Sequence, residues 1–174
     1  SQYQEEAKAY QTKAAAQGTE LSKQYFETFN QYAGLPAAFD AASVTELQKN
    51  DLVVGTGEEI KADSTFTAYY LGWNPTGKVF DGSIADGALK APLEVAPGAV
   101  IKGWSEGVVG MKTGGVRELA IPASLAYGEA GSGEDIPANT PIKFVVMVIP
   151  TPEKITQPLP SEELQKLYTR LYGN

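Results

Sequence analysis

The sequence predicts an α+β fold in which an antiparallel sheet packs on one short α-helix, with helical extensions at both ends of the chain. Three observations support this: the apolar spacing is helical up to about Tyr32, becomes strand-like from Asp51, and is helical again after the last prolines. The chain has 174 residues, of which 43% are hydrophobic and 20% charged, as in one globular domain with helical additions. We therefore expect an extension and linker at 1–50, a core domain at 51–150, and a tail with a terminal helix at 151–174.

The segment from Ser1 to about Tyr32 favours a helix because it is rich in Ala, Gln, Glu, Lys and Tyr and contains no proline. Its helical spacing gives one apolar stripe of Leu21, Tyr25, Phe29 and Tyr32 and a weaker one of Tyr3, Ala7, Tyr10 and Ala14. Gly18 lies between the stripes, which leaves open one bent helix or two helices that meet at Gln17 and Gly18. Gly34-Leu35-Pro36 then ends the segment.

The N-terminal helix has three alternative roles. Its stripes can dock on the chain's own domain, form a homodimer, or serve as a spacer from a membrane anchor. Residues 37–50 follow as a polar connection in which a short helix at about Ala38–Ala42 is expected, and we place the domain boundary in this connection.

The core domain carries β-branched and aromatic runs that predict strands. These runs are Leu52–Val54, Thr65–Leu71, Val116–Ile121 and Ile142–Ile149. Turn signals separate them, at Asn74-Pro75-Thr76-Gly77, Asp81-Gly82, Pro97-Gly98 and Gly131-Ser132-Gly133. One helix interrupts the strands, from Lys102 or Gly103 to Val109, and Gly110 closes it. We expect a pocket between this helix and the concave face of the sheet.

Prolines at 150, 152, 158 and 160 predict an extended tail that leads into a terminal helix. Ser161 is its expected N-cap, followed by two acidic residues that favour the first turn. Its apolar face would consist of Leu164, Leu167, Tyr168 and Leu171. We expect this face to pack against the N-terminal helix or a partner.

The composition excludes several kinds of chemistry. The chain has no Cys and no His, which excludes thiol nucleophiles, disulfides, imidazole bases and His-ligated zinc. A net charge of −7 without a basic cluster argues against nucleic acid as a partner. Glu58-Glu59 and Glu134-Asp135 are interpreted as solvated loop charge, while Gly55-Thr56-Gly57 and Gly77-Lys78 lack the remaining residues of nucleotide-binding motifs. We expect neither a cofactor nor a metal.

The sequence bears on the compartment only indirectly. No stretch reaches the roughly 18 apolar residues of a membrane span, and a chain without Cys suits either side of a membrane. The chain opens at Ser1 rather than Met, as either a processed product or a trimmed chain does. We therefore favour an exported or membrane-tethered protein with a removed N-terminal anchor over a cytoplasmic one, and leave the compartment unknown.

Aromatic, apolar and glycine residues recur through the core domain in a specific order. They are Tyr70-Leu71-Gly72, Gly77-Lys78-Val79-Phe80-Asp81, Val100-Ile101-Lys102-Gly103-Trp104, Glu106-Gly107, Met111, Gly114, Ala126-Tyr127-Gly128, Ile136-Pro137 and Phe144. On this ordered set, the segment from about Asp51 to Ile149 resembles a peptidyl-prolyl cis-trans isomerase domain of the FKBP type. The resemblance implies a strongly bent antiparallel sheet wrapped around the short helix.

The resemblance also implies the roles of individual residues, with the prolyl ring of a substrate resting on the indole of Trp104. The catalytic residues implied are Tyr70, Phe80, Asp81, Trp104, Tyr127 and Phe144. The further substrate-binding residues implied are Val100, Ile101, Ile136, Leu93 and Ala126. In this family the backbone N–H matching Ile101 and the hydroxyl matching Tyr127 donate hydrogen bonds to substrate carbonyls, and Asp81 would accept one from Tyr70.

The rim of the pocket departs from the best-known members of the family. The positions concerned are Asp86, Ala91, Pro92, Leu93, Ser132 and Asp135. At Ala91 or Pro92 an aromatic is common, Leu93 replaces a frequent Phe, and a basic partner for the pocket acid is often found near Asp86. We expect these differences to act on substrate preference and leave the centre of the pocket intact.

An aromatic pocket with almost no titratable chemistry suits rotation about an X–Pro bond. The barrier of about 18–20 kcal/mol arises from amide resonance, so twisting the bond requires no proton transfer. We predict an isomerase that acts on proline-containing peptides and unfolded proteins. The alternative is a non-catalytic peptide-binding or chaperone-like module that uses the same pocket together with the helical extensions. The resemblance further implies binding of the macrolides tacrolimus or rapamycin.

Overall fold

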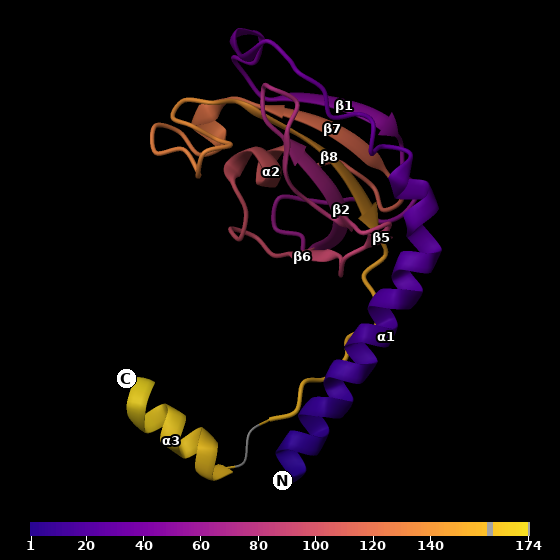
Figure 1. Cartoon of the computed structure of the whole chain (residues 1–174), viewed down its shortest axis with the longest axis vertical. Helices are drawn as coiled ribbons and strands as arrows, with labels where there is room; N and C mark the ends of the chain where they lie inside the picture. The colour runs from indigo at the N-terminus through magenta and orange to yellow at the C-terminus, as the bar shows by residue number, and fades with distance from the viewer. Residues whose placement is uncertain (160–161, 174) are drawn as a thin grey trace.

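An antiparallel sheet curves around a short helix, and a long helix leaves the domain from the other side of the sheet (Figure 1). The computed structural model describes residues 1–159 and 162–173. In chain order the elements are α1 (Gln2–Asn30), η1 (Ala41–Ser43), β1 (Gln48–Val53), β2 (Phe66–Trp73), β3 (Val79–Gly82), β4 (Ile84–Ala85), β5 (Ala88–Leu89), β6 (Leu93–Val95), α2 (Lys102–Gly107), β7 (Val116–Ile121), η2 (Ala123–Leu125), β8 (Ile142–Ile149) and α3 (Glu162–Tyr172). This arrangement confirms the predicted α+β fold.

The sheet has the strand order β1-β7-β8-β2-β3, and β6 pairs with the opposite end of β2 from β3. Every pairing is antiparallel. The central strands β2 and β8 are buried along almost their whole length. Both faces of the sheet are therefore covered, which explains why these strands are apolar without alternation.

Two apolar clusters lie on the two faces, because successive side chains of a strand point to opposite sides. The inner cluster, on the α2 side, includes Phe66, Ala68, Trp104, Val108, Leu119, Ile121, Ile142, Phe144, Val146 and Val148. The outer cluster, on the α1 side, includes Phe29, Tyr69, Leu71, Trp73, Leu89, Val116, Val145, Met147 and Ile149. The single residue that α1 buries completely, Phe29, belongs to the outer cluster.

Helix α1 is continuous from Gln2 to Asn30, so of the two alternatives left open at Gly18 the structure contains one helix. A Cβ at Gly18 would have no heavy atom within 4 Å, which means that no packing contact requires glycine there. Ser1 caps the helix through a capping box with Gln4. Over the described residues, we find no helix with the length and apolar character needed to cross a bilayer.

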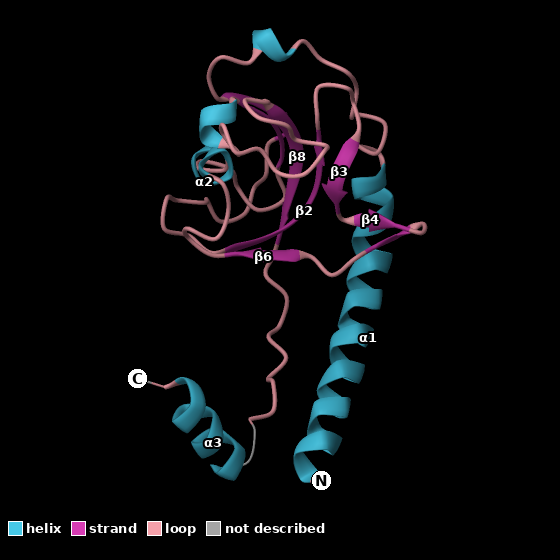
Figure 2. Cartoon of the chain, turned by 60° about the vertical axis from the view of Figure 1, so that its left-hand side comes forward, coloured by secondary structure: helices cyan, strands magenta, loops and turns pink. Residues whose placement is uncertain are grey.

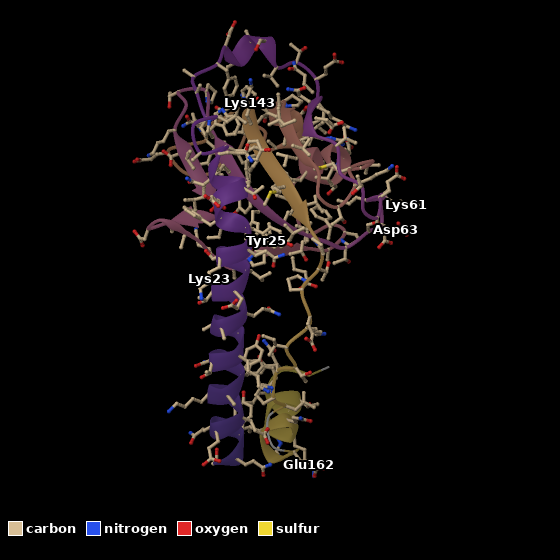
Figure 3. The ribbon with its side chains drawn as sticks, turned by 90° about the vertical axis from the view of Figure 1, so that its right-hand side faces the viewer. Lys23, Tyr25, Lys61, Asp63, Lys143 and Glu162 are labelled. Carbon is tan, nitrogen blue, oxygen red and sulfur yellow. The ribbon has the colours of Figure 1, made fainter. Side chains whose placement is uncertain are left out.

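The C-terminal half of α1 docks on its own domain, which confirms that alternative for the stripe around Phe29. The rings of Tyr25 and Phe29 lie 6.0 and 6.1 Å from that of Tyr69. Tyr25 lies on the side of α1 that faces the sheet, whereas Lys23 points away from it (Figure 3). The outer cluster of the core domain therefore includes part of α1.

The N-terminal half of α1 projects beyond the sheet and runs beside the extended tail (Figure 1). The Gln17 amide donates to the Glu153 carbonyl at 2.6 Å, and the Gln157 amide donates to the Tyr10 hydroxyl at 3.2 Å. The tail thus covers part of the weaker stripe of α1.

Several boundaries differ from the expected ones. β1 begins at Gln48, three residues before the predicted boundary, and its first residues are polar and exposed and pair with β7 through the backbone. The short helix expected at Ala38–Ala42 is a 3₁₀ turn at Ala41–Ser43, since the Asp40 carboxylate caps it at Ala42. Helix α2 ends at Gly107 rather than Val109.

The terminal helix α3 is present, but its predicted N-cap, Ser161, and the side chain of Leu164 lie outside the described residues. Leu167, Tyr168 and Leu171 are exposed. The expectation that these side chains pack on α1 of the same chain is therefore wrong, and packing on a partner remains a prediction.

Tyr69 is fully buried, and its hydroxyl has no hydrogen-bond partner among the described residues. Burial, followed by the nearby Tyr25, raises the pKa of Tyr69 from 10.0 to about 12. Above pH 10 tyrosine ionises in the unfolded chain while Tyr69 keeps its proton in the folded one. The stabilising contribution is therefore complete below pH 10 and is lost as the pH rises through about 12.

We expect Tyr69→Phe to stabilise the protein by about 1 kcal/mol at pH 7, because it removes a buried hydroxyl without a partner. Between pH 10 and 12 the free energy of unfolding should also fall less steeply than in the wild type, by up to about 1.4 kcal/mol per pH unit. Urea titrations at several pH values measure both effects, with exposed Tyr168→Phe as the control. A clear loss of stability at pH 7 would contradict the prediction.

Candidate functional site

Helix α2 lies against β7 at a distance that only glycine permits. A Cβ at Gly107 would lie 2.8 Å from Leu119 Cδ1, and a Cβ at Gly103 would collide with the side chain of Ile121. This close approach places Trp104, which is 3% exposed, at the floor of the concave face.

Three aromatic rings contact the Trp104 indole, and a fourth ring, Phe80, packs on one of them. Tyr70 from β2 and Phe144 from β8 each meet it edge to face, with centroids 5.4 Å away and interplanar angles of 86°. Phe80 from β3 meets Phe144 in the same way at 5.7 Å, and Phe66 stacks on Trp104 at 6.5 Å. Edge-to-face pairs fix ring orientation, so the floor and walls hold one another in place. Phe66 was not among the predicted site residues, because nothing in the local sequence separates it from other core residues.

Gly72 allows this aromatic arrangement. A Cβ at Gly72 would lie 2.5 Å from Phe144 Cε1 and 2.8 Å from Phe80 Cζ. The glycine in Tyr70-Leu71-Gly72 therefore leaves the space in which these two rings meet.

The hydroxyl of Tyr70 donates a hydrogen bond to Asp81 Oδ2 at 2.6 Å, as the resemblance implied. The other carboxylate oxygen of Asp81 accepts from the backbone N–H of Gly82 at 2.9 Å. Burial, followed by the bond to Asp81, raises the pKa of Tyr70 well above its ordinary value. Within the described ranges Asp81 has no ion-pair partner, as expected from Asp86 at the position where a base is frequent.

These side chains line a cavity of about 490 Å³ on the concave face. Its lining consists of Tyr70, Phe80, Asp81, Leu93, Gly98, Ala99, Val100, Ile101, Trp104, Tyr127 and Phe144. Nine predicted site residues are thus brought together, and Gly98 and Ala99 were missed because turn residues carry no side-chain signal. Ile136 and Ala126 do not line this cavity; Ile136 is buried in the inner cluster and Ala126 packs against it.

The backbone N–H of Ile101 and the hydroxyl of Tyr127 lie at the cavity and have no acceptor in the part of the chain that the structure describes. The Tyr127 side chain is 37% exposed. In contrast, the Tyr70 hydroxyl is engaged by Asp81. The donors at Ile101 and Tyr127 are therefore free to bind a further acceptor.

Arg117 holds the C-terminal end of α2, although the sequence did not single it out. Its guanidinium donates to the carbonyls of Gly107 and Val109 at 2.8 and 3.0 Å and to Asp51 at 2.7 Å. Cations are favourable at a helix C-terminus, where carbonyls lack intrahelical partners. Arg117 thereby ties the helix that carries Trp104 to β7 and β1.

Asp135, interpreted from the sequence as solvated loop charge, instead bridges two segments. Its carboxylate accepts from Lys78 at 2.7 Å, and its carbonyl accepts from the buried Asn74 amide at 2.9 Å. The bridge joins the turn before β3 to the loop that contains Ile136. Among the described residues, no three acidic side chains lie close enough together to hold a metal ion.

Comparisons with known proteins place these features in a family. Residues 56–149 match the family model described as FKBP-type peptidyl-prolyl cis-trans isomerase. The chain is 42% identical over 95 residues to a probable FKBP-type peptidyl-prolyl cis-trans isomerase of Haemophilus influenzae, covering 55% of this chain and 38% of the relative. It is 39% identical over 99 residues to an FK506-binding protein of Neisseria meningitidis, covering 57% and 90%.

The crystal structure of FkpA from Escherichia coli is similar in fold, with a TM-score of 0.54 at 34% identity. The similarity covers 82% of this chain and 63% of FkpA. This chain thus spans less than two thirds of FkpA, and 38% of the Haemophilus influenzae relative.

We expect Gly103→Ala to destabilise the protein by about 1–3 kcal/mol, because the added methyl group has no room against Ile121. The matched control is Gly18→Ala in α1, where the new Cβ meets nothing within 4 Å. The same substitution should stabilise the protein there by about 0.4–1 kcal/mol. Urea denaturation measures both, and an unchanged stability of Gly103→Ala would show that α2 can move away from β7.

Proposed function

Because the chain belongs to the family of FKBP-type peptidyl-prolyl cis-trans isomerases, we propose that it accelerates rotation about X–Pro bonds in peptides and unfolded proteins. The observation that carries the proposal is the ring arrangement around Trp104, with Tyr70 and Phe144 edge to face on the indole. In the proposal the prolyl ring rests on Trp104, between the walls that Phe80 and Tyr127 contribute.

The chemistry required is modest and matches the residues present. Rotation about the X–Pro bond breaks the conjugation between the carbonyl group and the nitrogen. No covalent bond is formed and no proton is transferred. An apolar cavity that grips the ring and keeps water from the carbonyl favours the twisted state over the planar one. The cavity lining is aromatic and aliphatic except for Asp81, whose carboxylate is engaged by Tyr70.

Two donors orient the substrate in this proposal. The Ile101 N–H and the Tyr127 hydroxyl have no acceptor in the described residues, so each can donate to a carbonyl next to the proline. Leu93 of β6 and Val100, in the segment before α2, add apolar contact. Ile136 supports the pocket from the inner cluster rather than touching the substrate.

We also propose that the pocket binds tacrolimus or rapamycin. The support is the name of the Neisseria meningitidis relative, an FK506-binding protein, together with the aromatic lining that this chain provides. Leu93 at the rim replaces a frequent aromatic, so affinity is expected to depend mainly on the contacts near Trp104.

A non-catalytic peptide-binding or chaperone-like module is the second candidate function. It is favoured by α3, which exposes Leu167, Tyr168 and Leu171 and so offers apolar surface outside the pocket. Both candidates bind proline-containing chains, but only an isomerase changes the rate of cis–trans exchange.

We expect the intact chain to accelerate exchange of an Ala-Pro peptide measured by NMR, and Trp104→Leu to lower kcat/KM by roughly ten- to hundredfold. Tacrolimus should inhibit the wild type. The matched control is Trp73→Phe. Trp73 is the other tryptophan of the chain and lies in the outer cluster, so this substitution should lower stability but leave the isomerase activity unchanged.

Circular dichroism checks that each variant is folded. A folded wild-type chain with no effect on the exchange rate would overturn the isomerase in favour of the binding module. A folded, fully active Trp104→Leu variant would overturn the role of Trp104, and activity that tacrolimus does not inhibit would overturn the macrolide proposal.

We further propose that the chain forms a homodimer through the exposed part of α1. Tyr3, Ala7 and Tyr10 continue the stripe of α1 beyond the domain at helical spacing and are only half-buried. Light scattering at tens of micromolar should give twice the mass of one chain. Ala7→Glu should reduce the mass to that of one chain, with exposed Lys8→Glu as the control, and a monomeric wild type would contradict the proposal.

A further inference from the structure

The wall of the pocket that carries Phe80 and Asp81 is an edge strand. β3 has four residues and pairs with β2 alone. An edge strand has ladder hydrogen bonds on one side only, so its position depends on what holds its two ends. Both ends of β3 are held by the N-terminal segment of the chain.

Ser83, directly after β3, ties this wall to Tyr70. Its hydroxyl accepts from the Tyr70 N–H at 2.8 Å, and its own N–H donates to the Tyr70 carbonyl at 2.8 Å. Its carbonyl accepts from the N–H of Lys90 at 2.8 Å, and the residue is only 4% exposed. Ser83 therefore links Tyr70, which contacts both Trp104 and Asp81, to the chain that returns after β5.

The small hairpin of β4 and β5 between Ser83 and Lys90 rests on α1 (Figure 2). The backbone N–H of Leu89 donates to Ser22 Oγ of α1 at 2.9 Å. The Leu89 side chain is 7% exposed and lies in the outer cluster with Phe29. Ile84, opposite Leu89 in the hairpin, packs against the same cluster.

The turn that precedes β3 is held by the segment that follows α1. The N–H of Phe39 donates to the Pro75 carbonyl at 3.0 Å. A Cβ at Gly77 would lie 2.7 Å from the backbone nitrogen of Ala38, so this turn packs tightly on residues 37–39. The N-terminal segment thus contacts both the turn before β3 and the hairpin after it.

We infer that Ser22 of α1 is a positioning residue for the prolyl pocket, acting through Leu89, Lys90 and Ser83 on Tyr70 and the wall of β3. The inference rests on the proposed isomerase function. It assigns to α1 a part in substrate binding, although no residue of α1 lines the cavity.

The Ser22 hydroxyl is a suitable target because its loss does not weaken α1 itself. Alanine has a higher helix propensity than serine, so Ser22→Ala should leave the helix at least as stable. It would leave the Leu89 N–H without its acceptor, and the hairpin would lose a contact that fixes its position on α1. If the pocket wall formed by β3 is held less firmly, the binding of the substrate and of the transition state is weakened equally. Such a change raises KM and leaves kcat almost unchanged.

The test measures kcat and KM for isomerisation of an Ala-Pro peptide by the intact chain. We expect Ser22→Ala to lower kcat/KM roughly two- to fivefold, mainly through KM, and Ser22→Thr, which keeps the hydroxyl, to restore it. Hydrogen exchange of the Leu89 amide should become faster in Ser22→Ala but not in Ser22→Thr or in the control variant. The matched control is Thr19→Ala, one turn earlier on α1, whose hydroxyl bonds only within the helix, to the Ala15 carbonyl at 3.0 Å.

Each outcome decides the matter. A higher KM for Ser22→Ala, rescued by Ser22→Thr and absent from Thr19→Ala, supports the inference. Kinetics of Ser22→Ala equal to the wild type, an equal effect of Thr19→Ala, a failure of Ser22→Thr to rescue, or a loss of stability at unchanged KM would each overturn it. An inactive wild type would instead overturn the proposed function, so the two failures are distinguishable.

Discussion

The close approach of α2 to β7 is the constraint on which the pocket depends. Gly103 and Gly107 face Ile121 and Leu119 without side chains of their own, and Arg117 binds the carbonyls at the end of the helix. With the helix held at this distance, Trp104 reaches the centre of the inner cluster, where Tyr70 and Phe144 meet it edge to face. The cavity exists because a rigid indole occupies the floor, and neighbouring rings cannot collapse onto it without leaving their preferred geometry.

A second constraint comes from the sheet, which is apolar on both faces. Helix α2 covers the inner face, but the outer face would expose Tyr69, Trp73 and Met147 if α1 were absent. Burying such a surface is worth about 25 cal/mol per Å² of apolar area, so the C-terminal half of α1 is part of the folded domain. The hairpin of β4 and β5 lies at the border of that outer cluster, which is why a helix outside the pocket contacts the strand next to it.

Local patterns were sufficient to predict the elements with strong periodicity, which are the stripe of Leu21 to Tyr32 and the apolar runs of β2, β7 and β8. The aromatic positions of the pocket were implied by the resemblance to the FKBP family. β1 was not predicted to begin at Gln48, because exposed polar residues join a sheet through backbone pairing that leaves no pattern in the side chains. Phe66, Arg117 and the bridge of Asp135 to Asn74 were missed because their partners are distant in the chain, 61 residues apart in the last case.

Residue types and their order indicated the kind of site: aromatic rings in a specific order, glycines beside them, and neither Cys nor His to supply a thiol or an imidazole. Those properties belong to residue types and short spacings, which can be recognised without coordinates. The packing of whole elements, in contrast, places Ile136 and Ala126 outside the cavity and brings Ser22, 67 residues from Leu89, to the hairpin next to its wall. Burial and hydrogen bonding between distant segments depend on this packing, and no local sequence pattern encodes it.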